Sequence, residues 1–280
     1  MGGVLVIVGT PLGNREDLSP RARAAILGAD LLMCEDTRSP VRLFGDGAGL
    51  PPRRSCFVGN EHERVAGLLE ALAAGSRVVY ISEAGMPCWS DPGEQLVRAA
   101  LEAGFAVDVV PGPTAVATAV ALSGLPSQEI RFVGFPPRGG RLRTEFIAGL
   151  RYESATTVCY EAGNRTRDLV VDLAAGLEDA ESRDIAIARE MTKLHQEVRR
   201  GTVARVAAEL PESMLGEVTV VLAPAARGRG DVAREAASAV LATVLDKSLR
   251  PRERARRLAA LTGEPAREIY ARLDSAHDEE

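Results

Sequence analysis

Short apolar runs alternate along the chain with stretches whose apolar residues recur at helical spacing. The runs are rich in β-branched residues, as strands are, and they occupy residues 4–8, 29–36, 76–82, 106–110, 131–135, 156–161, 184–190 and 217–223. The stretch after residue 93 shows the helical spacing, because Leu96, Val97, Ala100 and Leu101 fall on one helix face. Strands that alternate with helices in this order predict an α/β fold.

Two helix starts carry capping signals. Ser19 stands as an N-cap residue before a proline at the first helical position. Asp91 and Glu94 repeat the arrangement around a second proline, with Glu94 placed to close a capping box. We therefore predict that Asp91 caps the helix that Gly104 ends, which is a structural role.

The length favours two domains, since domains cluster at roughly 100 to 200 residues and this chain has 280. A boundary is indicated by "LSGLPSQEI" at 122–130, and "RGRGD" from Arg227 resembles a linker. No strand pattern follows that linker. We expect two α/β domains at residues 1–120 and 121–226, with a small helical C-terminal extension at 227–280.

Composition excludes several classes of protein. With 46% hydrophobic and 26% charged residues the chain is an ordinary folded protein, and no apolar run approaches the ~20 residues of a membrane span. The run at 4–8 also lacks the flanks of a signal peptide, so we expect a cytoplasmic protein. The four cysteines show no paired spacing, which favours reduced structural thiols and no metal site.

The charge pattern is acidic overall and basic in one segment. The net charge of −5 argues against a protein that coats nucleic acid by bulk electrostatics. Between Lys247 and Arg257, however, "KSLRPRERARR" contains Glu253 as its only acidic residue. This segment is either a phosphate-binding face or a solvated helix face.

Three loops of unusual composition follow predicted strands: "GTPLGN" at 9–14, "EAGMPCW" at 83–89 and "PGPTA" at 111–115. Ligands of open α/β sheets bind at the carboxyl ends of the strands, and glycine with proline lets rigid backbone approach a ligand closely. The string "GDGAG" at 45–49 has the spacing of a dinucleotide loop but lacks a strand before it and a helix after it, so we interpret it as a flexible loop.

Together with "EDTR" at 35–38, these loops resemble the tetrapyrrole methylase superfamily, and within it the small-subunit ribosomal RNA cytidine 2′-O-methyltransferases. Further matching stretches are "GFPPR", "YE..NR", "AREMTKLHQE" and the tail "RERARRLAALTGEPAREIYARL". The family pattern Asp-Ala-Gly-Thr-Pro is replaced here by Glu83-Ala-Gly-Met-Pro87, and Ser-Pro-His-Arg by Ala162-Gly-Asn-Arg165. Another departure is "FVGNEHE" at 57–63.

The resemblance implies that S-adenosyl-L-methionine is the methyl donor and that it binds in a cleft between two α/β domains. The residues expected at the donor are Pro11, Glu83, Gly85, Met86, Pro87, Thr114, Ala115, Tyr160, Glu161 and Ala223. Trp89 either shields this site or packs its loop.

Methyl transfer to a ribose hydroxyl needs an aligned acceptor and either a base that removes the hydroxyl proton or a cation that stabilises the developing alkoxide. We take Lys193, Glu35 and Arg38 as catalytic candidates. Lys193 is one of only two lysines in an arginine-rich chain, and Glu35 and Arg38 lie just past a strand. His195 is a possible base or a structural hydrogen-bonding residue. For Glu35, a salt-bridged strand end is an equal alternative.

The expected partner is small-subunit ribosomal RNA or the assembled 30S subunit, and the resemblance also implies a homodimer. Arg38, Arg250, Arg252 and Arg256 are the expected RNA contacts. Two other functions stay open: a small-molecule tetrapyrrole or corrinoid C-methyltransferase, and a non-catalytic ribosome-associated protein that binds the donor.

Overall fold

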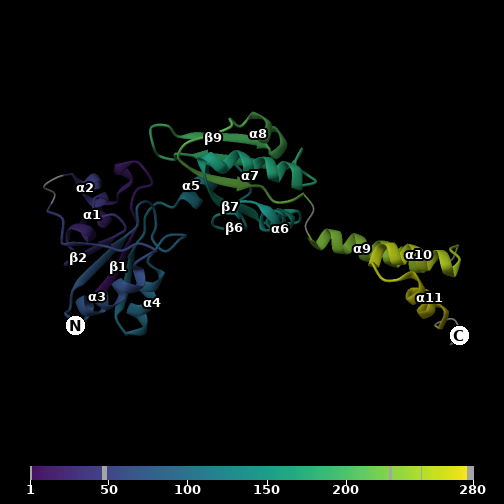
Figure 1. The fold of residues 1–280 in the computed structure, drawn as a ribbon, viewed down its shortest axis with the longest axis horizontal. Coiled ribbons are helices and arrows are strands. Elements are labelled where there is room, and N and C mark those ends of the chain that lie inside the picture. The colour runs from purple at the N-terminus through teal and green to yellow at the C-terminus, as the bar shows by residue number, and fades with distance from the viewer. Residues whose placement is uncertain (1, 46–48, 227–228, 247, 276–280) are drawn as a thin grey trace.

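The structure is a computed structural model that describes residues 2–45, 49–226, 229–246 and 248–275. Two α/β bodies lie side by side, and a helical extension projects beyond the second of them (Figure 1). The "GDGAG" loop lies partly outside the described residues, as does the start of the expected linker at Arg227. Within the described part of the chain, no helix combines the length and the hydropathy that a membrane span requires.

The first body is an open, fully parallel sheet with strand order β3-β2-β4-β1-β5. Its apolar clusters cover both faces, which explains why the central strands read as continuous apolar runs. The strands are β1 (Val4–Val8), β2 (Leu31–Cys34), β3 (Arg53–Ser55), β4 (Arg77–Ile81) and β5 (Ala106–Val110). The helices are α1 (Pro20–Leu27), α2 (Ser39–Phe44), α3 (Glu61–Ala73) and α4 (Glu94–Glu102), with a 3-10 turn at Arg15–Asp17.

The second body is a mixed sheet with strand order β6-β7-β10-β8-β9. β6 and β7 are parallel, whereas β10 runs antiparallel to β7 and β8, and β9 antiparallel to β8. The strands are β6 (Ile130–Phe132), β7 (Thr156–Ala162), β8 (Asp184–Arg189), β9 (Glu197–Thr202) and β10 (Glu217–Leu222). The helices are α5 (Ala115–Ser123), α6 (Gly140–Leu150), α7 (Gly163–Gly176) and α8 (Val203–Glu209).

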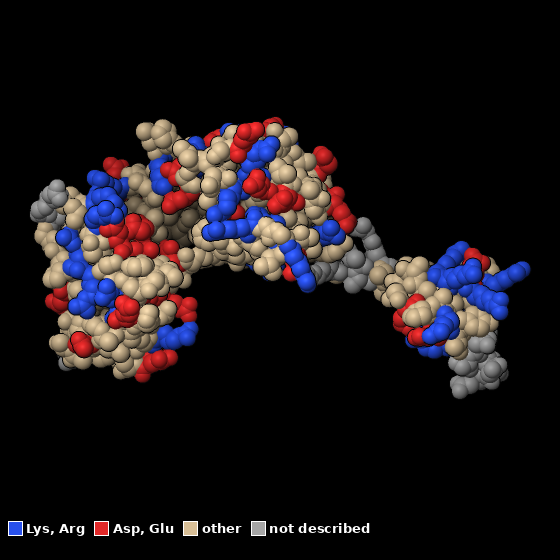
Figure 2. Space-filling model, viewed as in Figure 1, with Lys and Arg blue, Asp and Glu red and all other residues tan. Residues whose placement is uncertain are grey.

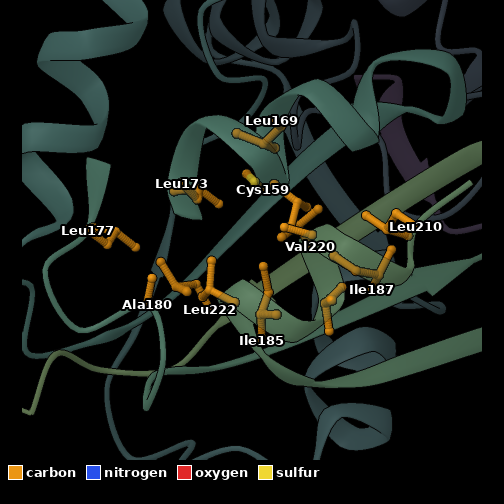
Figure 3. Close-up of a cluster of buried hydrophobic side chains, with 14 of the residues drawn as sticks. Cys159, Leu169, Leu173, Leu177, Ala180, Ile185, Ile187, Leu210, Val220 and Leu222 are labelled. Atoms are coloured by element: carbon orange, nitrogen blue, oxygen red, sulfur yellow. The ribbon is translucent and has the colours of Figure 1, made fainter. Parts of the chain in front are cut away.

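Two apolar layers sandwich this second sheet. On one face, β10 contributes Val220 and Leu222 to a core shared with Leu169 and Leu173 of α7 (Figure 3). On the other face, Val221 packs in a cluster that includes residues of α5. Because α5 follows directly after the third loop of the first body, this packing ties the two bodies together.

The C-terminal residues form the helical extension that the sequence predicts: α9 (Arg229–Leu245), α10 (Pro251–Thr262) and α11 (Ala266–Ser275). Its small core consists of Ala255, Leu258 and Ile269, with Val240 of α9 packed against them. The extension therefore has apolar contacts of its own, separate from the cores of the two sheets.

One predicted helix cap is confirmed and the other is wrong. The Ser19 hydroxyl accepts a hydrogen bond from the amide of Ala22 at 3.0 Å, as an N-cap should. At α4 the N-cap residue is Gly93 with φ 122°, and the buried Glu61 of α3 accepts bonds from amides of the first turn, including that of Gly93 at 2.9 Å. Asp91 therefore does not cap the helix.

Candidate functional site

The three predicted loops meet at the carboxyl edge of the parallel sheet. Thr10 and Gly85 exchange backbone hydrogen bonds of 2.8 and 3.1 Å, and the amide of Gly112 donates to Met86 Sδ at 3.2 Å. A Cβ atom on Gly9 would lie 2.7 Å from the Cα of Gly112, so only glycine permits this approach. The three loops follow β1, β4 and β5, so the expectation that they lie at the carboxyl ends of strands is confirmed.

A cavity of about 340 Å³ lies between the two bodies, next to these loops. Its volume is in the range of small-molecule sites. The first body contributes Leu12, Glu83, Ala84, Gly85, Met86, Trp89, Ser90, Asp91, Thr114 and Ala115. The second contributes Phe135, Tyr160, Glu161, Ala162, Met191, Lys193, Gly216, Glu217, Val218 and Thr219.

The structure brings seven of the ten expected donor residues to this cavity and leaves three away from its lining. Pro11 and Pro87 belong to the converging loops without lining the cavity. Ala223 lies past the opposite end of β10, where its carbonyl accepts a bond from Arg183. Because β10 is antiparallel to its neighbours, its amino end, at Glu217, faces the cavity instead.

Acidic side chains line one part of the cavity. Glu83, Asp91 and Glu217 all contribute, and Figure 2 shows acidic groups beside the hollow between the two bodies. Burial raises the pKa of Asp91 to about 6, repulsion from Glu35, Glu217 and Glu83 adds to the shift, and a hydrogen bond with Ser82 opposes it. The cavity thus favours a cationic ligand.

Glu35 lies outside the cavity lining and contacts one of its acidic residues, Glu83. We call Glu83, Asp91 and Glu217 the acidic wall. Its carboxylate accepts a hydrogen bond from the amide of Glu83 at 2.9 Å, and the Glu83 carboxylate in turn accepts bonds from the Ser39 hydroxyl at 2.8 Å and the Asp36 amide at 3.1 Å. Burial raises the pKa of Glu35, while the bond from Glu83 opposes that shift. Glu35 is placed to position the loop and does not line the cavity.

Arg38 lies on the surface near this network. Its side chain is 80% exposed and pairs with the Asp36 carboxylate at 2.7 Å. That hydrogen bond lowers the pKa of Asp36 to about 2. Arg38 therefore lies outside the cavity with its guanidinium accessible to a large partner.

Lys193 enters the cavity from the second body. Its Nζ atom lies 3.0 Å from Glu190 Oε1 and 2.9 Å from Glu217 Oε2. Burial lowers the pKa of Lys193, but the hydrogen bonds to Glu217 and Glu190 outweigh it and the net shift is upward. Lys193 therefore stays protonated, and the two carboxylates fix the position of its ammonium group. His195, two residues later, is exposed and outside the cavity lining.

The loop that carries Lys193 touches the first body. Thr192, with φ 65°, accepts a hydrogen bond from the amide of Asn14 at 3.1 Å. A Cβ atom on Gly13 would collide with Lys193 Cγ. The first Gly/Pro loop and the lysine loop therefore close one side of the cleft together.

Comparison with known proteins identifies the family. The model of the tetrapyrrole (corrin/porphyrin) methylases matches residues 4–207, which spans both sheets except for the last strand. The chain belongs to this family. The resemblance drawn from the loop motifs is thereby confirmed.

Relatives of this tetrapyrrole methylase extend over most of its length. A Thermotoga maritima protein named ribosomal RNA small subunit methyltransferase I is 41% identical over 221 residues, which are 79% of this chain and 98% of that protein. A Synechocystis protein of the same name is 35% identical over 270 residues, 96% of each chain. The second match includes the helical extension.

Solved structures show the same fold. The methyltransferase CobJ has a TM-score of 0.60 at 19% identity, covering 81% of this chain and 95% of its own. The uroporphyrin-III C-methyl transferase of Thermus thermophilus, solved with S-adenyl homocysteine, has a TM-score of 0.54 at 20% identity and covers 84% of this chain and 100% of its own. The expectation of two α/β domains is confirmed.

Several lining residues of this tetrapyrrole methylase were not singled out from the sequence. Asp91 was predicted to cap a helix. Phe135 and Met191 lie in the stretches "GFPPR" and "AREMTKLHQE", which match the family as motifs without indicating which residue lines the cavity. Glu217, Val218 and Thr219 were missed because the wrong end of their strand was taken. No local signal in the sequence gives the direction of that strand.

Proposed function

We propose that the chain is an S-adenosyl-L-methionine-dependent methyltransferase that methylates the 2′-hydroxyl of a cytidine in small-subunit ribosomal RNA. The observation that carries the proposal is the acidic cavity at the three converging loops, in a chain that aligns over 96% of its length with a relative named ribosomal RNA small subunit methyltransferase I. The family includes methylases of other acceptors, so the acceptor is the part that needs testing.

The lining suits this donor. S-adenosyl-L-methionine supplies an electrophilic methyl group on a positively charged sulfonium. Glu83, Asp91 and Glu217 offer negative charge to its sulfonium and ammonium groups, and Met191 with Tyr160 offers apolar surface for its adenine. The glycine loops let backbone amides and carbonyls approach it closely.

The reacting oxygen needs a charge partner, and Lys193 is placed to be one. Its ammonium is held at the cavity by two carboxylates, so it keeps its proton at neutral pH. A fixed positive charge stabilises the negative charge that develops on a ribose oxygen. We assign Glu35 a positioning role through the Glu83 loop, because that is where its hydrogen bond goes.

RNA contacts are proposed on two surfaces. Arg38 is exposed beside the cleft, and its carboxylate partner can be exchanged for a phosphate. Arg250, Arg252 and Arg256 are exposed around the start of α10, and Figure 2 shows basic side chains gathered on the extension. The two surfaces would hold a large RNA on either side of the second body.

Transfer of a labelled methyl group from S-adenosyl-L-methionine to small ribosomal subunits that lack this modification tests the function. Nucleoside analysis should recover the label in 2′-O-methylcytidine. Donor binding by calorimetry without transfer would instead favour a tetrapyrrole or corrinoid acceptor, or a non-catalytic ribosome-associated protein. Raised salt should weaken subunit binding steeply, because phosphate contacts release counterions.

We further propose a homodimer in the cytoplasm, on the resemblance alone. Light scattering on the purified protein measures its oligomeric state, and a homodimer should have a mass near twice 29.7 kDa. A mass of one chain would contradict the homodimer, and a single chain with its cleft would then be the active unit.

A further inference from the structure

A connected group of aromatic side chains borders the cavity. The chain has one Trp, four Tyr and six Phe, and four of these residues form edge-to-face contacts here. Ring centroids lie 5.7 Å apart for Trp89 and Phe132, 4.8 Å for Phe132 and Tyr160, and 5.6 Å for Tyr160 and Phe135. Since Trp89 belongs to the first body and the others to the second, the aromatic group spans the cleft.

The two outer members of this group are exposed although they line the cavity. Trp89 is 44% exposed and Phe135 is 59% exposed, whereas Tyr160 between them is half-buried. Leu194 and Leu215, each next to a lining residue, are 93% and 81% exposed. Exposed large apolar side chains that border a cavity are typical of a binding surface.

The loops that carry the two rings are held in fixed shapes. Cys88 and Ser90, on either side of Trp89, have φ values of 69° and 57°, which are strained for residues with a side chain. A Cβ atom on Gly134, directly before Phe135, would lie only 3.5 Å from the Ser90 hydroxyl oxygen. The Trp89 loop and the Phe135 loop are therefore neighbours, and strain of this kind concentrates at functional sites.

We propose that Trp89 and Phe135 bind the base of the acceptor nucleotide, a pyrimidine, by stacking against it. This inference rests on the proposed ribose methylation. A nucleotide must leave its own stack to bring its ribose into a cavity between two domains, and aromatic side chains replace the stacking that it loses. Trp89 and Phe135 line the cavity and keep large exposed surfaces, so they are placed to meet an acceptor that arrives from solvent.

Charge fixes which end of the nucleotide enters. The carboxylates of Glu83, Asp91 and Glu217 repel phosphate from the cavity, so the base and ribose enter while the phosphates stay outside. Arg38 is exposed outside the cavity and is suited to a phosphate there. This arrangement favours a nucleotide within a polymer over a free nucleotide, whose terminal phosphate carries more negative charge.

Methyl-transfer kinetics on undermethylated small subunits test the stacking. Trp89→Leu and Phe135→Leu keep apolar bulk but remove the ring, and Phe135→Tyr keeps a ring. Tyr152→Leu is the matched control, because Tyr152 is half-buried in the second body and outside the cavity lining. Each leucine variant should lower kcat/KM for subunits by roughly 5- to 150-fold, the usual effect of losing one base stack. Phe135→Tyr and the control should stay near wild type, and donor affinity by calorimetry should be unchanged in all four.

The outcomes separate the two proposals. Leucine variants with the kcat/KM of the wild type would overturn the stacking while leaving ribose methylation standing. A loss of donor affinity that parallels the loss of kcat/KM would also overturn it, because the rings would then hold the adenine of the donor. A wild-type protein that binds the donor but transfers no methyl group to subunits would overturn the proposed function and the stacking with it.

Discussion

Replacing Asp91 with Asn tests whether the acidic wall of the cavity holds a cationic donor. Asparagine keeps the size of the side chain and removes its charge. A hydrogen bond between charged partners contributes about 1.5–3 kcal/mol, so the Kd for S-adenosyl-L-methionine should rise by roughly 10- to 150-fold. Calorimetry at pH 7.5 and at pH 5 measures this directly.

The pH dependence gives a second, independent magnitude. With a pKa of about 6, Asp91 is roughly 90% ionised at pH 7 and roughly 10% at pH 5. Wild-type affinity for the donor should therefore fall about tenfold between pH 7.5 and pH 5. The groups whose charge acts on Asp91 include Glu35, Glu83 and Glu217, and all three remain in the variant, so the Asp91→Asn protein should lack this tenfold step.

Stability supplies the control against a folding defect. Asp91 binds its proton more tightly in the folded protein than in the unfolded chain, since its pKa rises from 3.8 to about 6. Its ionisation therefore opposes folding increasingly as pH rises through that window and by a constant amount above it. After screening of a partly exposed group is allowed for, the cost is about 1 kcal/mol, so the Asn variant should be at least as stable as wild type at pH 7.5. Wild-type donor affinity and an unchanged pH step in a stable variant would refute the reasoning.

Three further predictions concern the lysine, the helix cap and the extension. Lys193→Ala should abolish methyl transfer while calorimetry still detects the donor; normal turnover would remove Lys193 from the mechanism. Glu61→Ala should lower the free energy of unfolding by about 2–4 kcal/mol in urea, because it leaves the first amides of α4 without their buried acceptor, whereas Glu63→Ala, exposed in the same turn of α3, should cost little. Deleting residues 227–280 should weaken subunit binding more than donor binding, and equal loss of both would indicate misfolding.

The sequence predicted the inner strands of both sheets and missed two of the outer ones. β1, β4 and β10 are buried on both faces, so they appear as apolar runs that no helix of that length would show. β3 and β9 lie at sheet edges and carry "RRS" and "EVRRGT". Charged side chains on an edge strand discourage pairing with another chain, and they also erase the apolar pattern that a reader of the sequence relies on.

The two halves of the site also differ in how well the sequence predicted them. In the first body the strands are all parallel, so loops that follow them share one edge, and composition was enough to bring the three loops together. In the second body β10 runs antiparallel to its neighbours. The rule that ligands bind at the carboxyl ends of strands therefore predicted Ala223, whereas Glu217 at the amino end of β10 lines the cavity. Strand direction is a property of the whole sheet, which the residues of one strand do not encode.

Asp91 shows how a tertiary contact can override a local signal and create a site. Glu61, 32 positions before Gly93, takes the helix amides that Asp91 was expected to cap. Asp91 is thereby left at the cavity, in repulsion with its acidic neighbours and on a loop in which four residues, Gly85, Cys88, Ser90 and Gly93, have positive φ values. Both features cost stability in the protein without ligand, and a bound cation relieves the repulsion. The thermal shift produced by S-adenosyl-L-methionine should therefore be smaller in Asp91→Asn than in wild type, even though the variant without donor is no less stable.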